Sequence, residues 1–192
     1  ITYGYESVLR YCDEVGIDVM APERLDIFSI EKIRKIKPDI IFSIYYRKVF
    51  PQALIDIPKL GCINIHPSLL PEYRGPTPTA WAILNGERYS GVTIHYMDKE
   101  IDTGDILVQK RFEIGEYETG YELYTRAMTI GGNLLKRNFS SIVTRKIKAK
   151  RQVGVGSYFG KIDARYFINW KSRTDHVVNQ IRVRGKPYSP AE

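Results

Sequence analysis

The chain has 192 residues, of which 43% are hydrophobic and 27% are charged. This is the composition of a globular protein with a buried core, and it excludes a disordered, collagen-like or coiled-coil chain. Cys12 and Cys62 are too few for a disulfide framework or a four-ligand zinc site, so no metal site is expected. Every apolar stretch is far shorter than the roughly 18 residues of a membrane span. We therefore expect a soluble, cytoplasmic protein with no membrane partner.

The net charge of +7 is divided unevenly along the chain. Residues 1–135 contain 15 Lys and Arg against 19 Asp and Glu, a net charge of −4. Residues 136–192 contain 14 against 3, a net charge of +11. A basic tail of this kind is typical of a surface that binds nucleic acid or phosphate, but solvated helix faces often have the same composition. We favour the second interpretation.

Helical and strand-like patterns alternate in the first part of the chain. The first helix is expected to begin at Ser29 and to end before Pro38, and Pro51 opens the second helix. The first strand is apolar nearly throughout, as in strands that are buried on both faces of a parallel sheet. The expected elements are a helix over 29–37, a strand over 39–45, a helix over 52–57 and a strand over 62–65. This alternation predicts an α/β doubly wound sheet with its functional site at the carboxyl ends of the strands.

The second part of the chain predicts a hairpin, a long helix and a basic unit of different character. Thr119 and Glu122 have the spacing of a capping box and mark the start of an amphipathic helix. Ser172 and Asp175 are expected to cap a last helix. The expected elements are strands over 91–97 and 106–112 with a turn over 102–105, a helix over 119–140, a glycine-containing linker over 141–157 and a helix through 177–181.

A polar pair lies at the end of the second predicted strand. Asn64 and His66 are two residues apart, so in a strand their side chains point to the same side. An amide donor beside an imidazole suits a reaction in which an oxygen gains negative charge while a proton leaves a nucleophile. Asp102, in the later turn, is the candidate that orients or charges the imidazole. The alternative is a buried histidine with a purely structural role, and His95 is expected to be a surface or packing residue.

The wider context of this pair narrows the interpretation. It consists of Asn64-x-His66-x-Ser68-Leu69-Leu70-Pro71-x-Tyr73-Arg74-Gly75, Trp81-Ala82-Ile83, Asn85-Gly86, Gly91-Val92-Thr93-Ile94 and Ile101-Asp102-Thr103-Gly104-Asp105. At these spacings the chain resembles the 10-formyltetrahydrofolate-dependent formyltransferases from about residue 3 to its end. The resemblance implies the Rossmann-like, mostly parallel sheet of the formyltransferase fold. It also implies a catalytic domain over 1–150 that lacks the family's first strand, and a linker with the start of a small C-terminal subdomain over 151–192.

By that resemblance the chain is an N-formyltransferase, with Asn64, His66 and Asp102 as its catalytic triad. The co-substrate that the resemblance implies is 10-formyltetrahydrofolate, and no metal is implied. The implied folate contacts are Lys48, Val49, Phe50, Asp98, Lys99, Glu100, Ile101 and Asp102.

Residues 38–47 are most similar to the sugar N-formyltransferases, such as the domain that formylates UDP-4-amino-4-deoxy-L-arabinose. This implies a nucleotide-linked 4-amino sugar as the acceptor and a role in cell-surface polysaccharide biosynthesis. Arg74, in the loop after the second strand, is the candidate to bind a substrate phosphate through two hydrogen bonds. Pro76 stands where the arabinose enzyme has an arginine, so the resemblance does not fix the sugar nucleotide.

Two other interpretations stay open. Methionyl-tRNA formyltransferases share the triad, and in such an enzyme the basic tail would be the tRNA surface. A non-catalytic nucleic-acid-binding module would also use this tail, but it has no use for Asn64, His66 and Asp102. The sequence does not fix the oligomeric state and leaves a homo-oligomer open.

Overall fold

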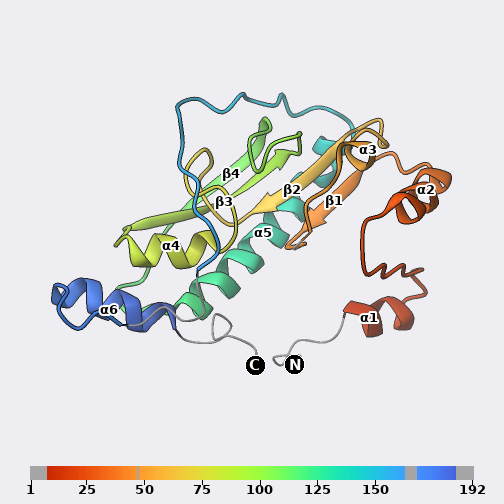
Figure 1. Cartoon of the computed structure of the whole chain (residues 1–192). Helices are drawn as coiled ribbons and strands as arrows, with labels where there is room; N and C mark the ends of the chain where they lie inside the picture. The colour runs from red at the N-terminus through yellow and green to blue at the C-terminus, as the bar shows by residue number, and fades with distance from the viewer. Residues whose placement is uncertain (1–7, 47, 163–167, 185–192) are drawn as a thin grey trace.

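The structure is a computed structural model that describes residues 8–46, 48–162 and 168–184, so that Arg47 lies outside it. A four-stranded sheet with the order β1-β2-β3-β4 forms its centre (Figure 1). The strands are β1 (Ile41–Ile44), β2 (Cys62–His66), β3 (Tyr89–Tyr96) and β4 (Ile106–Glu113). The helices are α1 (Val8–Glu14), α2 (Ile27–Ile36), α3 (Gln52–Ile55), α4 (Pro78–Leu84), α5 (Gly120–Val143) and α6 (Thr174–Val183). None of these helices is long and apolar enough to cross a membrane.

The α/β class is confirmed, and the sheet is mixed. β1 and β2 run parallel, whereas β3 is antiparallel to both β2 and β4. Within the described strands, a mixed sheet thus takes the place of the mostly parallel sheet that we expected. The connection between β3 and β4 is short, and it explains why these two strands are antiparallel. Parallel neighbours need a longer crossover of a dozen or more residues.

The first predicted helix and strand differ from expectation at their ends. Asp26, not Ser29, is the N-cap of α2, because its carboxylate accepts a hydrogen bond of 2.9 Å from the backbone N–H of Ser29. The helix ends at Lys37, directly before Pro38, as expected. The prediction that the first strand is buried on both faces is wrong, because within β1 only Ser43 is fully buried and Ile44 is 50% exposed.

The main core lies between the sheet and α5. Its buried members are Ile63, Ile65, Val92, Ile94, Leu107, Ala127 and Ile142. Gly131 allows the helix to approach the sheet closely, since a Cβ atom at this position would lie 2.9 Å from Cγ2 of Ile65. Figure 1 shows α5 running along one face of the sheet. The amphipathic helix that the capping box predicts is therefore the element that covers this face.

A smaller cluster joins α4, α5 and α6. Its buried members are Ala80, Ala82, Ile83, Leu84, Ile114, Leu123 and Val183. The N-cap of α6 is Arg173 rather than Ser172, and no side chain caps this end, because Asp175 accepts its hydrogen bond from the N–H of His176 instead. α6 thus packs against the rest of the described chain, while the division into residues 1–150 and 151–192 stays a prediction.

Residues 150–159, which we call the strap, pack against the sheet and the loop after β2. From the composition, this part of the chain is expected to be a linker. Lys150 and Ile106 exchange two backbone hydrogen bonds of 2.8 Å. Farther along, the N–H of Arg74 donates to the carbonyl of Ser157 at 2.9 Å, and its carbonyl accepts from the N–H of Phe159 at 3.0 Å. Figure 1 shows this part of the chain between the end of α5 and the start of α6. The strap therefore joins the loop after β2 to the start of β4.

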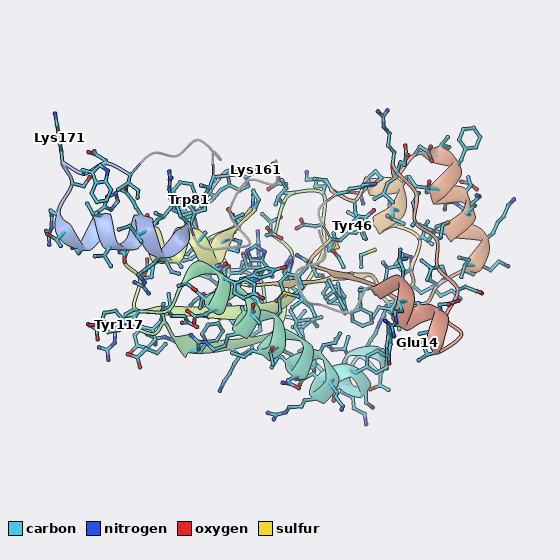
Figure 2. All side chains as sticks on the ribbon, turned by 90° about the horizontal axis from the view of Figure 1, so that it is seen from below. Glu14, Tyr46, Trp81, Tyr117, Lys161 and Lys171 are labelled. Carbon is cyan, nitrogen blue, oxygen red and sulfur yellow. The ribbon has the colours of Figure 1, made fainter. Side chains whose placement is uncertain are left out.

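Aromatic contacts hold the far end of the strap. Phe159 stacks on both Tyr73 and Trp81, with ring centroids 5.0 Å apart in each pair. The indole N–H of Trp81 donates a hydrogen bond of 2.8 Å to the carbonyl of Gly160. Figure 2 shows Trp81 on the same side of the molecule as Lys161. These contacts attach the strap to α4.

The capping box of α5 gives a testable prediction. The hydroxyl of Thr119 accepts from the N–H of Glu122, and the Glu122 carboxylate accepts from the N–H of Thr119 at 2.8 Å. We expect Thr119→Ala to lower the free energy of unfolding by about 1 kcal/mol. Thr129→Ala, the same change at an exposed site within α5, is the control and should leave the free energy of unfolding unchanged or slightly raised. Equal losses in the two variants, measured by urea denaturation, would contradict the capping role.

Candidate active site

The connection between β3 and β4 places a carboxylate inside the molecule. Asp102 lies in this connection with a φ of 57°, and its side chain is 11% exposed. Asp98 closes the turn by accepting a hydrogen bond of 2.6 Å from the hydroxyl of Thr103. Gly104 is required in the turn, because a Cβ atom there would lie 1.9 Å from the carbonyl oxygen of Tyr96. The turn thus holds Asp102 in a left-handed conformation, which aspartate adopts more readily than most residues.

Four nitrogen atoms surround the Asp102 carboxylate. Oδ1 lies 3.2 Å from Nδ2 of Asn64 and 3.6 Å from Nε2 of His95. Oδ2 lies 2.9 Å from the backbone nitrogen of Gly75 and 3.5 Å from Nδ1 of His66. The structure therefore brings Asn64, His66 and Asp102 together around one carboxylate, and their catalytic role stays a prediction.

His95 is the member of this group that sequence reasoning missed. Asn64 lies opposite His95 in the register of β2 and β3, and His66 lies opposite Thr93. Residues that face one another on neighbouring strands point to the same side of a sheet, so these four side chains share one face. His95 is 1% exposed, and its Nε2 is 3.3 Å from Nδ2 of Asn64. The expectation of a surface or packing residue is corrected, because His95 belongs to the site.

Backbone carbonyl groups determine which ring nitrogen of each of the two imidazoles carries a hydrogen. Nε2 of His66 is 2.8 Å from the carbonyl oxygen of Tyr73, and Nδ1 of His95 is 2.7 Å from that of Tyr96. A carbonyl oxygen only accepts hydrogen bonds, so each of these ring nitrogens carries a hydrogen. In the neutral imidazole of His66, Nδ1 is then unprotonated and faces Asp102. His66 therefore takes up a proton on the side of the carboxylate.

Burial and charge act in opposite directions on these groups. Burial lowers the pKa of His66 below 6.5, although the Asp102 carboxylate and the Tyr73 carbonyl act to raise it. Burial also acts to raise the pKa of Asp102, but the neighbouring histidines His66 and His95 and the hydrogen bond from the Gly75 N–H outweigh it and lower this pKa to about 2. The site thus combines an ionised carboxylate with an imidazole whose protonation burial opposes.

A cavity of about 710 Å³ opens beside the Asp102 turn. This volume lies within the range of about 300–1000 Å³ that is usual for small-molecule sites. Its lining includes Asp98, Lys99 and Glu100, which the sequence predicts as folate contacts, and Arg74, which it predicts as a substrate contact. Nε of Arg74 is buried and has no hydrogen-bond partner among the described residues. The Nε–H group of Arg74, a residue that lines the cavity, is therefore a donor that no described residue uses.

The other predicted folate contacts are not part of this lining. They are Lys48, Val49, Phe50, Ile101 and Asp102. The ammonium group of Lys48 donates a hydrogen bond of 3.0 Å to the carbonyl of Pro22, and Val49 is 70% exposed. Both residues lead into α3, whose Gln52 does line the cavity. Among the described residues, no group of three or more His, Cys, Asp or Glu side chains could hold a metal ion.

Comparison with protein families identifies the chain at the level of its family. The formyl transferase model matches residues 20–138, which include Asn64, His66, His95 and Asp102. The chain belongs to the formyl transferase family. The family and the fold that the resemblance implied are thus confirmed.

Two curated relatives with different names match this chain at similar identity. The methionyl-tRNA formyltransferase of Clostridium tetani is 38% identical over 171 residues, which cover 87% of this chain and 55% of the relative. The bifunctional polymyxin resistance protein ArnA of Wigglesworthia glossinidia brevipalpis is 39% identical over 193 residues, which cover 97% of this chain and 29% of the relative. The chain therefore spans about half or less of the length of these curated relatives.

A solved structure extends the comparison to the fold. The N-formyltransferase of Helicobacter canadensis, in complex with folinic acid and dTDP-3-aminofucose, is 30% identical and superposes with a TM-score of 0.81. The match covers 95% of this chain and 65% of the other. Together, these comparisons establish the family but do not separate a sugar acceptor from a tRNA acceptor.

The electrostatic link between Asp102 and His66 is testable by NMR. The charge of Asp102 acts to raise the pKa of His66, so the neutral amide in Asp102→Asn should lower that pKa further. We expect the imidazole resonances of His66 to titrate at a lower pH in the variant than in the wild type. The exposed His176 in α6 serves as the internal reference in both proteins. An unchanged midpoint for His66 would remove Asp102 from this role.

Proposed function

We propose that this chain provides the active site of an enzyme that transfers the formyl group of 10-formyltetrahydrofolate to the amine of a nucleotide-linked 4-amino sugar. The observation that supports this most directly is the buried group of Asn64, His66 and His95 around the Asp102 carboxylate, in a member of the formyl transferase family. With such an acceptor, the enzyme would serve the synthesis of cell-surface polysaccharides.

His66 is the proposed proton carrier. The amine nitrogen forms a bond to the formyl carbon, the bond from this carbon to N10 of the folate breaks, and one proton has to pass from the amine to N10. A neutral His66 is able to accept that proton, and Asp102, at 3.5 Å, then stabilises the imidazolium. Return of the proton to N10 restores the neutral imidazole, so the enzyme is unchanged after one turnover.

Asn64 is the proposed donor to the formyl oxygen, on which negative charge develops when the amine attacks. In the structure, Nδ2 of Asn64 lies 3.2 Å from Oδ1 of Asp102 and 3.3 Å from Nε2 of His95. One of these contacts therefore has to be exchanged for a hydrogen bond to the substrate. Asp102 keeps the N–H of Gly75 as a partner during this exchange.

The cavity beside the Asp102 turn is the proposed binding region for both substrates. On its wall, Asp98, Lys99 and Glu100 are the proposed folate contacts, together with Ile101 and Asp102 in the same turn. Lys48, Val49 and Phe50 would approach the folate from the loop before α3. Arg74 contributes a guanidinium group whose Nε has no partner among the described residues, which suits an oxygen of a diphosphate.

A methionyl-tRNA formyltransferase is the second candidate. The observation that favours it is the 38% identity to the Clostridium tetani enzyme, and the net charge of +11 over residues 136–192 would suit a tRNA backbone. The two candidates share the formyl donor and the Asp102 site, and they differ only in the acceptor.

Kinetic measurements on two variants test the catalytic assignment. We expect Asn64→Ala and His66→Ala each to lower kcat by about 100- to 1000-fold, while the affinity for the folate stays nearly unchanged. The matched controls are Asn138→Ala, whose amide donates a hydrogen bond to the carbonyl of Leu134 within α5, and His176→Ala at the surface. Both controls should keep wild-type kcat. Near-normal turnover of either site variant would show that the assignment is wrong.

A comparison of acceptors tests the proposed substrate. Purified protein is assayed with 10-formyltetrahydrofolate and UDP- or dTDP-linked 4-amino sugars, and separately with charged initiator tRNA. We expect formylation of an amino sugar with a weak dependence on salt, whereas a tRNA acceptor would lose binding by orders of magnitude between about 50 and 200 mM salt. Formylation of the tRNA and of none of the sugars would favour the second candidate.

The role of Arg74 is tested with the same assay. Because a guanidinium group binds phosphate through charge-assisted hydrogen bonds, Arg74→Ala should raise the KM for the sugar nucleotide by about tenfold or more. The KM for the folate should change much less. An equal change in both KM values would contradict a specific contact between Arg74 and the acceptor.

A further inference from the structure

Gln152, in the strap, touches both sides of the active site. Its Nε2 donates hydrogen bonds to the carbonyl of Asp102 at 2.9 Å and to the carbonyl of Gly104 at 2.8 Å. Its Oε1 accepts a hydrogen bond of 3.1 Å from the guanidinium group of Arg74. One half-buried side chain therefore joins the Asp102 turn to the loop after β2.

This arrangement uses chemistry that only an uncharged amide offers. Two carbonyl oxygens need a donor with two hydrogens, and the guanidinium group needs an acceptor. Glutamate accepts but has no hydrogens to donate, whereas lysine and arginine donate but do not accept. A glutamine side chain donates to the carbonyls of Asp102 and Gly104 and accepts from Arg74 at the same time.

Gln152 binds the turn at Asp102, a residue with a left-handed backbone conformation. Asp102 has a φ of 57°, and in this conformation its carboxylate lies within 3.6 Å of its four nitrogen partners. The carbonyl carbon and the Cβ atom of Asp102 are bonded to the same Cα atom. A hydrogen bond to the carbonyl therefore restricts rotation of the Asp102 backbone and, with it, the direction of the side chain. The strap itself is anchored on each side of Gln152, through Lys150 on β4 and through Ser157 on the loop after β2.

We propose that Gln152 is a positioning residue, which holds the Asp102 turn and thereby keeps the carboxylate at His66. Gln152 lines the cavity beside the Asp102 turn, and its proposed effect on the reaction passes through Asp102. The expected change in kcat rests on the proposed function. The effect of Gln152 on the environment of His66 is independent of the acceptor.

Two variants of Gln152 separate its donor and acceptor roles. Gln152→Met keeps the length of the side chain but removes both functions. Gln152→Glu keeps the acceptor for Arg74 and places an oxygen against the two carbonyl groups. If the donated hydrogen bonds position Asp102, both variants should lower kcat by about tenfold, with the KM for the folate changed by less than about twofold. Gln152→Met also removes the acceptor of the Arg74 guanidinium group, so a change in the KM for the sugar nucleotide is expected in this variant and not in Gln152→Glu. In Gln152→Met, His66 should titrate at a lower pH, because the charge that raises its pKa is less well held, whereas the new carboxylate in Gln152→Glu itself acts to raise that pKa.

A distant glutamine supplies the matched control. Gln180 in α6 is 1% exposed, and its Oε1 accepts a hydrogen bond of 2.8 Å from the N–H of Asn169. Gln180→Met should lower the melting temperature without changing kcat or the NMR titration of His66. A purely structural Gln152 would give the same result as this control.

Each outcome of the experiment decides the proposal. A lower kcat in both Gln152 variants and a His66 titration at lower pH in Gln152→Met support it. Wild-type values in Gln152→Glu alone would mean that Gln152 acts through Arg74, and a lower melting temperature alone would mean that it only stabilises the fold; either result overturns the proposal. If the wild-type protein formylates neither a sugar nor a tRNA, the proposed function fails, and the NMR titration still tests the role of Gln152.

Discussion

The burial of one ionised carboxylate is the constraint on which the site depends. A charge removed from water costs several kcal/mol unless hydrogen-bond donors and opposite charges replace the lost solvent. Asp102 meets this requirement with a backbone N–H from the loop after β2, an amide from β2, and one imidazole each from β2 and β3. Three segments, namely β2, the loop that follows it and β3, are therefore held at fixed positions around it.

The same constraint explains the electrostatic state of the site. Burial favours neutral His66, whereas the neighbouring carboxylate favours the imidazolium, and the two effects partly cancel. A histidine in this balance is suited to gain and lose a proton within one turnover, which is the role that the proposed reaction gives it. The carboxylate stays ionised throughout, because its nitrogen partners hold its pKa at about 2.

The rest of the fold keeps these segments rigid. α5 packs on the sheet through a close approach at Gly131, and the main core lies directly behind β2 and β3. On the other side of the site, the strap binds both the loop after β2 and the start of β4. A sheet, a helix and an extended segment thus restrain the same small group of polar side chains, which favours a preorganised site.

The sequence alone determined what depends on local spacing. Residues two apart in a strand share a side, which grouped Asn64 with His66, and the capping box at Thr119 marked the start of α5. The motifs around Asn64 and Asp102 were specific enough to indicate the family. The N-cap of α2 was misplaced because Asp26, three residues before Ser29, is also able to cap the helix, and the N-cap of α6 was misplaced because no side chain caps that helix.

Only the tertiary structure decided which distant residues meet. His95 joined the site because the register of β2 and β3 sets it opposite Asn64, and register is not encoded in the spacing of either strand. Gln152 reached Asp102 across 50 residues of sequence, in a stretch whose composition predicted only a linker. The described sheet was mixed for the same reason. Pairing partners are properties of the assembled sheet, and a pattern along one strand does not contain them.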